Sequence, residues 1–323
     1  MNEDIMQALP DLKTSTLKPF EKGDIFLGCT YLNNVNDDHM GEGRILQFDK
    51  EWRPKGTLYT EGTKYLIVGC RFAPDGTLWS FDSQNHVVVR VNTDGKQLEN
   101  WYPGRGLGSV SFCADGSMVF GEYFIGSEIW KGTTAKTLED GRLGDGDVYK
   151  YDADLNLLNH FPAENAPEFT NFKGVTHSTM HPSGEFITYT TETARRLMRL
   201  NIETGEQMDD LAGFPDADPY DRKDKRWFIA PDYLPDGRLL CTTAEGLQVF
   251  DESGGILKTI PLPGYGWAQV CHDVDTRYAL AANVFTGAAA RIDLEDKQPL
   301  QLIDTGFTAP FRSLAGISVY GGS

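Results

Sequence analysis

Pairs of short apolar runs, each joined by a tight turn, recur along most of this chain and limit what it can fold into. In the first kind of pair the turn contains Gly after Asp or Ser, and its copies begin at residues 72, 112, 180 and 233, with a degenerate copy at 271. Asp-Gly between two β-rich runs is typical of a β-hairpin. The second kind is an alternating run, a polar turn and another run, and its six copies begin at residues 45, 88, 148, 197, 247 and 290.

Each repeat therefore contains two hairpins, and four strands in roughly 40–50 residues are typical of a β-propeller blade. The first repeat lacks its innermost strand, and a candidate for that strand starts at Ser313, at the other end of the chain. Pairing it into the first blade closes the ring and removes open sheet edges. We predict an all-β fold, a six-bladed β-propeller with four-stranded blades closed by the C-terminal strand. Residues 1–20 are expected to form an N-terminal extension and residues 21–323 a single domain.

Charge and cysteine content indicate the partners and the compartment. The chain has 30 Lys and Arg against 47 Asp and Glu, a formal charge of −17, which disfavours nucleic acid and membrane surfaces as partners. No apolar stretch is long enough to span a bilayer, and the first 25 residues do not have the pattern of a secretory signal. The five cysteines are widely spaced and form no CxxC pair. We therefore expect buried free thiols and a cytoplasmic protein.

Three irregular segments interrupt the repeats. Residues 126–146 and 214–226 are rich in Gly, Asp and Lys and are predicted to be surface loops, which at this length are often functional or mobile. Residues 33–43 combine acidic and amide side chains. This composition is compatible with a bound divalent cation or with a solvated turn.

The topology of a propeller predicts where a site would lie. In each blade, the loop that leads into the innermost strand and the loop between the second and third strands meet at one mouth of the central channel. Basic residues recur in the first set of loops although the chain is acidic. They could focus a positive potential that attracts a carboxylate, or they could pair with neighbouring acids such as Glu61, Glu122 or Asp224. These basic residues are Lys64, Arg105, Lys173, Arg226 and Arg312.

Aromatic residues accompany these cations in the same loops. They could form an apolar, ring-stacking pocket or simply pack between blades. A flat or cyclic substrate with an acid group would suit both the rings and the cations. We predict that the substrate-binding residues are Lys64, Tyr65, Arg105, Lys173, Trp227, Trp267, Gln269 and Arg312.

For acid–base chemistry the leading candidate is His177, at the predicted start of an innermost strand, where side chains point into the channel. Histidine is the usual proton carrier near neutral pH, although a hydrogen-bonded core histidine would fit the same position. Glu122 or Glu192 would be its partner or a metal ligand. Further candidates are His86, His272 and Asp232.

The segment 231–263, with its Pro-Asp-Gly turn, resembles a blade of the SMP-30/gluconolactonase, NHL and strictosidine-synthase-like group of six-bladed propellers, and the hairpins at Phe72 and Phe112 agree with it. In the gluconolactonase branch, carboxylate and amide side chains at the starts of inner strands hold a divalent cation in the channel. The comparable carboxylate here is Asp232, so the resemblance implies one divalent cation (Ca, Mg or Zn). Strictosidine-synthase-like members work without a metal and use channel Glu or His residues, which leaves a protein without a cofactor as the alternative.

These observations together predict a propeller enzyme that acts on a small molecule at the channel mouth. The substrate would carry a carboxylate and an aromatic or cyclic body, and the reaction would be hydrolysis of the lactonase or esterase type or lyase chemistry. A non-catalytic module that binds a ligand or a protein remains the alternative.

Overall fold

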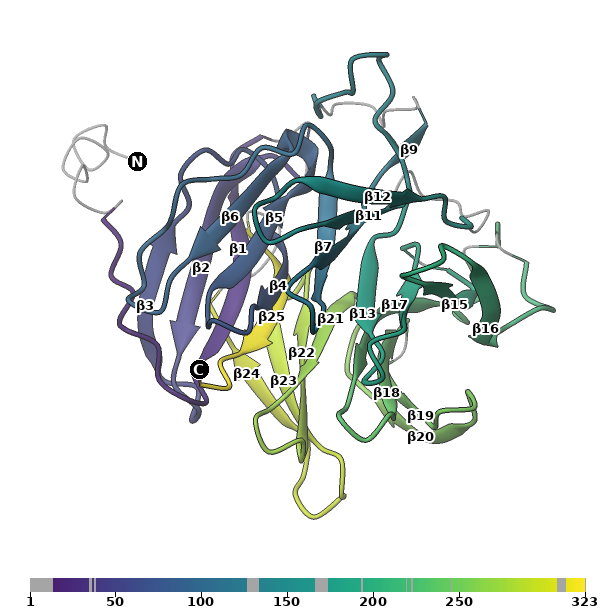
Figure 1. The fold of residues 1–323 in the computed structure, drawn as a ribbon. Coiled ribbons are helices and arrows are strands. Elements are labelled where there is room, and N and C mark those ends of the chain that lie inside the picture. Colours follow the sequence, from purple (N-terminus) through teal and green to yellow (C-terminus); the bar gives the residue numbers. More distant parts are fainter. Residues whose placement is uncertain are drawn as a thin grey trace.

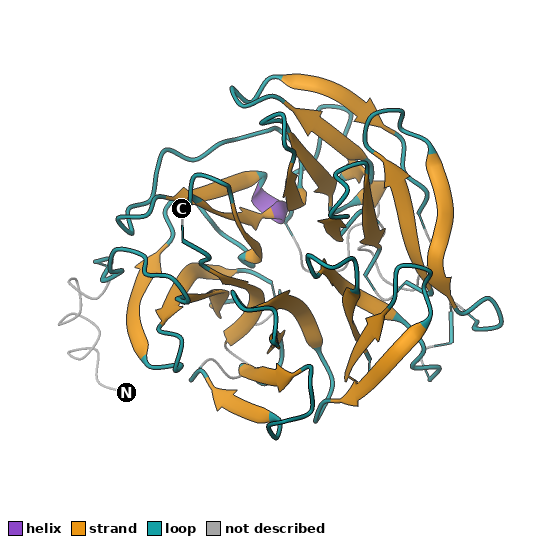
Figure 2. Ribbon diagram, turned by 60° about the horizontal axis from the view of Figure 1, so that its bottom comes forward, coloured by secondary structure: helices purple, strands orange, loops and turns teal. Residues whose placement is uncertain are grey.

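The computed structural model describes residues 14–34, 37, 39–126, 134–165, 174–192, 194–218, 220–221, 223–244, 246–306 and 312–322. Small antiparallel sheets are arranged in a ring (Figure 1), and Figure 2 shows them around a common centre. In these ranges the helical structure is one 3₁₀ turn, Ser83–Asn85. None of the described segments forms a helix long and apolar enough to cross a membrane.

Four of the sheets contain four strands each, and every neighbouring pair is antiparallel. A short hairpin of β9 (Ile125–Gly126) and β10 (Gly144–Asp145) extends from the first of them. The four sheets consist of β7 (Leu107–Phe112), β8 (Met118–Glu122), β11 (Val148–Tyr151) and β12 (Leu157–Phe161); β13 (His177–Met180), β14 (Phe186–Thr190), β15 (Arg196–Asn201) and β16 (Gln207–Gly213); β17 (Phe228–Tyr233), β18 (Leu239–Thr243), β19 (Gly246–Phe250) and β20 (Ile256–Pro261); and β21 (Trp267–His272), β22 (Tyr278–Asn283), β23 (Ala288–Asp293) and β24 (Gln301–Asp304).

A seven-stranded sheet contains both ends of the propeller. Its order is β3-β2-β1-β25-β4-β5-β6. The C-terminal β25 runs antiparallel to β1, from Val319 opposite Ile25 to Arg312 opposite Tyr31, which confirms the predicted closure of the first blade. The strands are β1 (Ile25–Leu32), β2 (Gly41–Phe48), β3 (Pro54–Tyr59), β4 (Val68–Phe72), β5 (Leu78–Asp82), β6 (Val87–Val91) and β25 (Arg312–Val319).

The innermost strands follow one another around a closed circle, in the order β4, β7, β13, β17, β21, β25 and back to β4. The last step, from β25 to β4, is made through the parallel pair Ala315 and Val68. This pair joins two predicted blades, β25-β1-β2-β3 and β4-β5-β6, into one seven-stranded sheet. Because these two blades are not separate sheets, the predicted number of six blades remains a prediction. The propeller arrangement itself is confirmed.

The predicted Gly-containing hairpins are present as β4–β5, β7–β8, β13–β14 and β17–β18. In all four of their turns a glycine has a positive φ angle, a conformation that Gly adopts without steric cost. These glycines are Gly76, Gly116, Gly184 and Gly237. Apolar side chains fill the space between neighbouring sheets, as where Trp79, Phe120 and Tyr151 pack together. Strands near the centre of the ring, such as β5, β8 and β17, are buried along their whole length.

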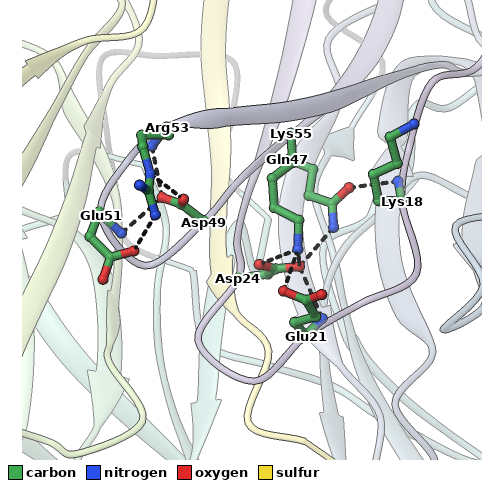
Figure 3. A network of polar contacts seen from close by, with 8 residues as sticks. All are labelled: Lys18, Glu21, Asp24, Gln47, Asp49, Glu51, Arg53 and Lys55. Carbon is green, nitrogen blue, oxygen red and sulfur yellow. Dashed lines mark hydrogen bonds and ion pairs between the residues drawn. The ribbon is translucent and has the colours of Figure 1, made fainter.

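The described part of the N-terminal extension lies against the propeller. The Thr16 amide donates a 2.9 Å hydrogen bond to the Thr57 carbonyl, and the Phe20 ring lies 4.4 Å from that of Phe26. A polar network continues this contact (Figure 3), in which the Lys18 amide donates to the Gln47 side chain. Residues 14–20 are therefore packed on the first sheet.

Next to this segment, the network in Figure 3 is centred on a buried carboxylate. Asp24 is 2% exposed, and its Oδ2 accepts hydrogen bonds from Gln47 Nε2 at 2.7 Å and from Lys55 Nζ at 2.8 Å. Charged and amide donors thus compensate the burial of this charge. The network lies on the outer part of the first sheet, away from the channel.

The predicted loops are tied to the ring at several points. In the segment 214–226, the buried Arg195 guanidinium donates to the carbonyls of Asp218, Asp221 and Asp224. The segment 126–146 includes residues 127–133, which lie outside the described residues. The two ends of this segment pair with each other as β9 and β10. In the segment 33–43, where residues 35, 36 and 38 lie outside the description, the His39 amide donates to Asp37 Oδ1. All five cysteines are free thiols, and four are buried.

Candidate functional site

Loops from several sheets bring a group of titratable side chains together at the predicted channel mouth. Glu192 follows β14, Tyr123 follows β8, and His39 lies between β1 and β2. The Tyr123 hydroxyl donates a hydrogen bond to the Glu192 carboxylate, and His39, when protonated, favours the ionised form of Glu192. Tyr265, which precedes β21, senses the charge of the same carboxylate. Glu192 is therefore the centre of this group.

The surroundings of Glu192 change its acidity. The side chain is partly buried, and burial raises the pKa of its carboxyl group to about 7, against the opposing effects of His39 and of the hydrogen bond from Tyr123. Burial and the neighbouring carboxylate raise the pKa of Tyr123, so the phenol keeps its proton. A carboxyl group with a pKa near neutrality gains and loses a proton readily at physiological pH, which is the requirement for a general base.

His177 is the first residue of β13, as predicted, and lies inside the ring. Its side chain is 9% exposed, and its ring centroid is 6.5 Å from that of Tyr123. Nδ1 lies 3.0 Å from Thr176 Oγ1, and no described residue hydrogen-bonds Nε2. Burial lowers the pKa of His177 to about 4, so the ring is neutral at pH 7. In this state it can donate or accept a hydrogen bond, but it does not carry a positive charge.

Side chains from the other inner strands line the same narrow cavity as His177. Gln269, another predicted site residue, contacts this cavity from β21. Ser109 of β7 is hydrogen-bonded to Ser178 of β13 at 2.8 Å, which joins two neighbouring sheets at its wall. The other inner strands contribute Arg71, Pro231 and Ile317. Residues that are far apart in the sequence thus share one channel, as the topology predicted.

Glu122 is a buried ion-pair residue at the end of β8. It is 0% exposed, its Oε1 is 3.1 Å from Arg105 Nη1, and its Oε2 accepts the amides of Asp145 and Gly146 at 2.7 and 2.9 Å. Burial raises the pKa of Glu122, and Arg105 and the two amides oppose this effect. No hydrogen bond or ion pair between described residues joins Glu122 to His177. The carboxylate therefore fastens the β9–β10 hairpin rather than facing the histidine.

Two of the predicted rim cations are paired with acids. Arg105 binds Glu122 and lies 3.9 Å over the ring of Tyr149, and Arg226 binds Asp216 and Asp224 at 2.8 and 2.7 Å. The alternative that these cations pair with neighbouring acids is confirmed for both.

Of the other three predicted rim cations, the structure describes the side chain of one. Lys64 is exposed and forms no ion pair with a described residue. Lys173 and the side chain of Arg312 lie outside the description. Whether these cations bind a substrate remains a prediction.

The predicted aromatic residues lie mostly in the protein interior. Trp227 and Trp267 are each 1% exposed, and the Trp267 indole donates to the Pro263 carbonyl at 3.1 Å. Tyr65 is 3% exposed and hydrogen-bonds Thr134 through its hydroxyl. These rings lie behind the mouth, in its walls. Of the two predicted alternatives, a ring-stacking pocket or packing between blades, the burial of both tryptophans fits packing between blades.

Asp232, the predicted metal ligand, lies near the end of β17 rather than at its start. The carboxylate is 1% exposed, with Oδ1 2.7 Å from Arg71 Nη1 and Oδ2 2.9 Å from His272 Nδ1. Burial alone would raise its pKa, but the charges of Arg71 and His272 outweigh burial and lower the pKa to about 2. Both oxygens are already bound by cationic groups, so this carboxylate does not fit a metal site. In the described part of the chain no three His, Cys, Asp or Glu side chains cluster as metal ligands.

Arg71 is the residue at this position that sequence reasoning missed. It lies on β4 between Cys70 and Phe72, and an Arg within an otherwise apolar inner strand is the signal that could have revealed it. A charged residue at a position that faces the channel requires a partner there.

No family model and no curated protein sequence matches this chain. Several solved structures are similar. A gluconolactonase from Xanthomonas campestris is 14% identical with a TM-score of 0.54, over 83% of this chain and 86% of that chain. A catalytically inactive histidine-to-alanine variant of virginiamycin B lyase from Staphylococcus aureus, with quinupristin, is 11% identical with a TM-score of 0.52, over 90% and 87%. A streptogramin B lyase is 12% identical with a TM-score of 0.51, over 88% and 89%.

At these identities the likeness concerns the fold. The predicted resemblance to gluconolactonase-type propellers is confirmed at that level, and this chain has the β-propeller fold seen in gluconolactonase and streptogramin B lyase structures.

Proposed function

We propose that this protein is an enzyme that transfers a proton in a small organic molecule bound at the channel mouth, with Glu192 as the general base. The observation that carries the proposal is the hydrogen bond from the Tyr123 hydroxyl to the partly buried Glu192 carboxylate. Burial raises the pKa of this carboxyl group to about 7. Titratable groups whose pKa values are shifted by burial and by a specific neighbour are typical of functional sites. The similar gluconolactonase and streptogramin B lyase structures support action on a small molecule.

Hydrolysis and elimination would begin with the same step. The Glu192 carboxylate would take a proton from a water molecule that attacks an ester carbonyl, or from a C–H bond whose electrons form a double bond as the leaving group departs. The Thr176 hydroxyl donates to the Thr190 carbonyl and therefore accepts from Nδ1–H of neutral His177. Nε2, which has no described hydrogen-bond partner, would accept a hydrogen bond from an N–H or O–H group of the substrate. His177 would thus position and stabilise the substrate rather than carry the proton.

A substrate panel tests this proposal. It comprises gluconolactone, aryl esters and quinupristin, assayed with wild type and with Glu192→Gln, Tyr123→Phe and His177→Gln. Glu185→Gln, an exposed change in the β13–β14 turn, is the matched control. We expect Glu192→Gln to lower kcat/KM by about 10²-fold or more, with the control at the wild-type value.

The same panel separates the reaction types and can refute the proposal. Incorporation of ¹⁸O from labelled water into the product identifies hydrolysis, and its absence with formation of a C=C bond identifies elimination. Full turnover in Glu192→Gln would exclude this residue as the base. Binding of a panel compound without turnover by wild type would support the alternative of a binding module.

A further inference from the structure

A second polar cavity lies at the other end of the inner strands. His177 and Ser178 line the cavity described above, whereas Thr179 and Met180, the next residues of β13, line this one. The volume of this second cavity is about 320 Å³, and its walls are the C-terminal halves of β4, β7, β13, β17 and β21. It is therefore separate from the mouth where Glu192 lies.

A three-residue charge network stands at the wall of this cavity. Arg71 Nη1 lies 2.7 Å from Asp232 Oδ1, and both the amide and Nδ1 of His272 bind Oδ2 of Asp232, at 3.1 and 2.9 Å. Burial lowers the pKa of His272, but the hydrogen bond to Asp232 and its charge outweigh burial and raise it. With the histidine protonated, the network holds two positive charges and one negative charge.

Donors of this network remain available to a ligand. The side chains of Arg71 and His272 are 31% and 29% exposed, whereas Asp232 is 1% exposed. Among the described residues, Nε and Nη2 of Arg71 and Nε2 of His272 have no hydrogen-bond partner. Ser111 and Thr179 also line the cavity. The buried Asp232 carboxylate thus orients the donors of Arg71 and His272 toward open space, because a carboxylate that accepts one N–H of an imidazole fixes the direction of the other.

Apolar side chains also line this open cavity. Phe72 and Phe112 lie at its wall beside Met180, Pro74 and the ring of Tyr233. A pocket that combines apolar side chains with converging polar groups is typical of a small-molecule site. We propose that this cavity is a second binding site, which takes a small monocarboxylate with an apolar body and holds its carboxylate between Arg71 and His272.

The charge count favours a carboxylate over a phosphate. The network has a net charge of at most +1, and Asp273, which senses the charge of His272, adds a nearby negative group. A dianion would therefore leave negative charge uncompensated. The planar guanidinium and imidazole also match the plane of a carboxylate, with which Arg forms paired hydrogen bonds.

Calorimetric titration with phenylacetate at pH 6 tests this site. Phenylacetamide is the neutral probe of the same shape, and inorganic phosphate is the charged probe without an apolar body. We expect phenylacetate to bind at least 10-fold more tightly than either. Arg71→Lys, which keeps the charge but loses the planar fork, and His272→Gln should each weaken phenylacetate binding at least 10-fold.

Glu192→Gln at the mouth is the control and should leave phenylacetate binding unchanged, which also separates this test from that of the proposed enzyme activity. Arg71→Lys affects a buried ion pair and could unfold the chain. In that case the binding of phenylacetate by His272→Gln and Ser111→Ala tests the proposal. The proposal is overturned if phenylacetate does not bind, if phenylacetamide binds equally well, or if the folded cavity variants bind phenylacetate like wild type.

Discussion

Arg71 and Asp232 face each other across the ring of inner strands, with Arg71 Nη1 2.7 Å from Asp232 Oδ1. Their strands, β4 and β17, are separated by two inner strands in either direction around the circle. Arg71 lines both the cavity of His177 and the cavity of His272. This ion pair therefore joins opposite sides of the propeller and lies between its two channel cavities.

Replacing Asp232 should remove an acid-sensitive part of the stability. Its pKa is lowered from 3.8 to about 2 in the folded protein, so its contribution is present above pH 3.8 and is lost as the pH falls through 2. We expect wild type to lose about 2 kcal/mol of unfolding free energy through this group, and Asp232→Asn to lack this loss. Urea denaturation at pH 5, 4, 3 and 2 measures it, with exposed Asp275→Asn as the control. Identical pH slopes in wild type and Asp232→Asn would contradict the assignment.

His177 should titrate far below the ordinary range of histidine. Burial lowers its pKa from 6.5 to about 4, so the folded state binds fewer protons than the unfolded state between these values. Stability should therefore fall as the pH drops from 6.5 through 4, by about 3 kcal/mol from this residue. The His177→Gln variant should lose this dependence and identify the His177 signal in an NMR titration. A midpoint between pH 6 and 7 would show that the ring is solvated.

Glu192→Gln should stabilise the protein while it removes activity. The pKa of Glu192 is raised from 4.5 to about 7, so ionisation costs the folded state stability as the pH rises through this interval. We expect the variant to be more stable than wild type at pH 8, by about 1–2 kcal/mol after allowance for partial exposure, and equally stable near pH 4. Denaturation at both pH values measures the difference. A variant that is less stable at pH 8 would indicate that the carboxylate is well solvated or paired.

The same residue should determine the pH dependence of the reaction. If Glu192 acts as a base in its ionised form, kcat/KM for any substrate of the panel should rise with pH to a plateau above about pH 7. Glu192→Asp should keep a rising profile, whereas Glu192→Gln should abolish it. A profile that is unchanged in the Gln variant would assign the titration to another group.

Deleting residues 312–323 should prevent closure of the ring. β25 lies between β1 and β4, and Leu314 and Ile317 are buried in the core next to β1. We expect the shortened chain to lose its cooperative urea transition and its near-ultraviolet circular dichroism, because two unpaired strands and an apolar face become exposed. Ser313→Ala, a small change on the same strand, serves as the control. A shortened chain with the wild-type midpoint would refute the role of β25 in closure.

Much of the fold could be predicted from the sequence because it depends on local patterns. Alternating apolar residues and Asp-Gly turns specify hairpins such as β17–β18 within a few residues of chain, and the unpaired run after Ser313 indicates the closure. The start of β13 at His177 follows from the same reasoning. The position of Asp232 along β17 does not, because the pattern of a strand does not specify which end of the channel a given side chain reaches.

The sequence by itself thus determined the strands, their pairing into hairpins and the completion of the first sheet by the last strand, since these depend on neighbouring residues and on the need to cover an edge. Only the tertiary structure decided which polar and charged side chains bind one another. Arg71 binds Asp232, 161 positions away, Arg105 binds Glu122, and Tyr123 binds Glu192. Each of these pairs depends on the angle at which successive sheets are placed around the channel and on the burial that results. No local pattern of residues encodes either quantity.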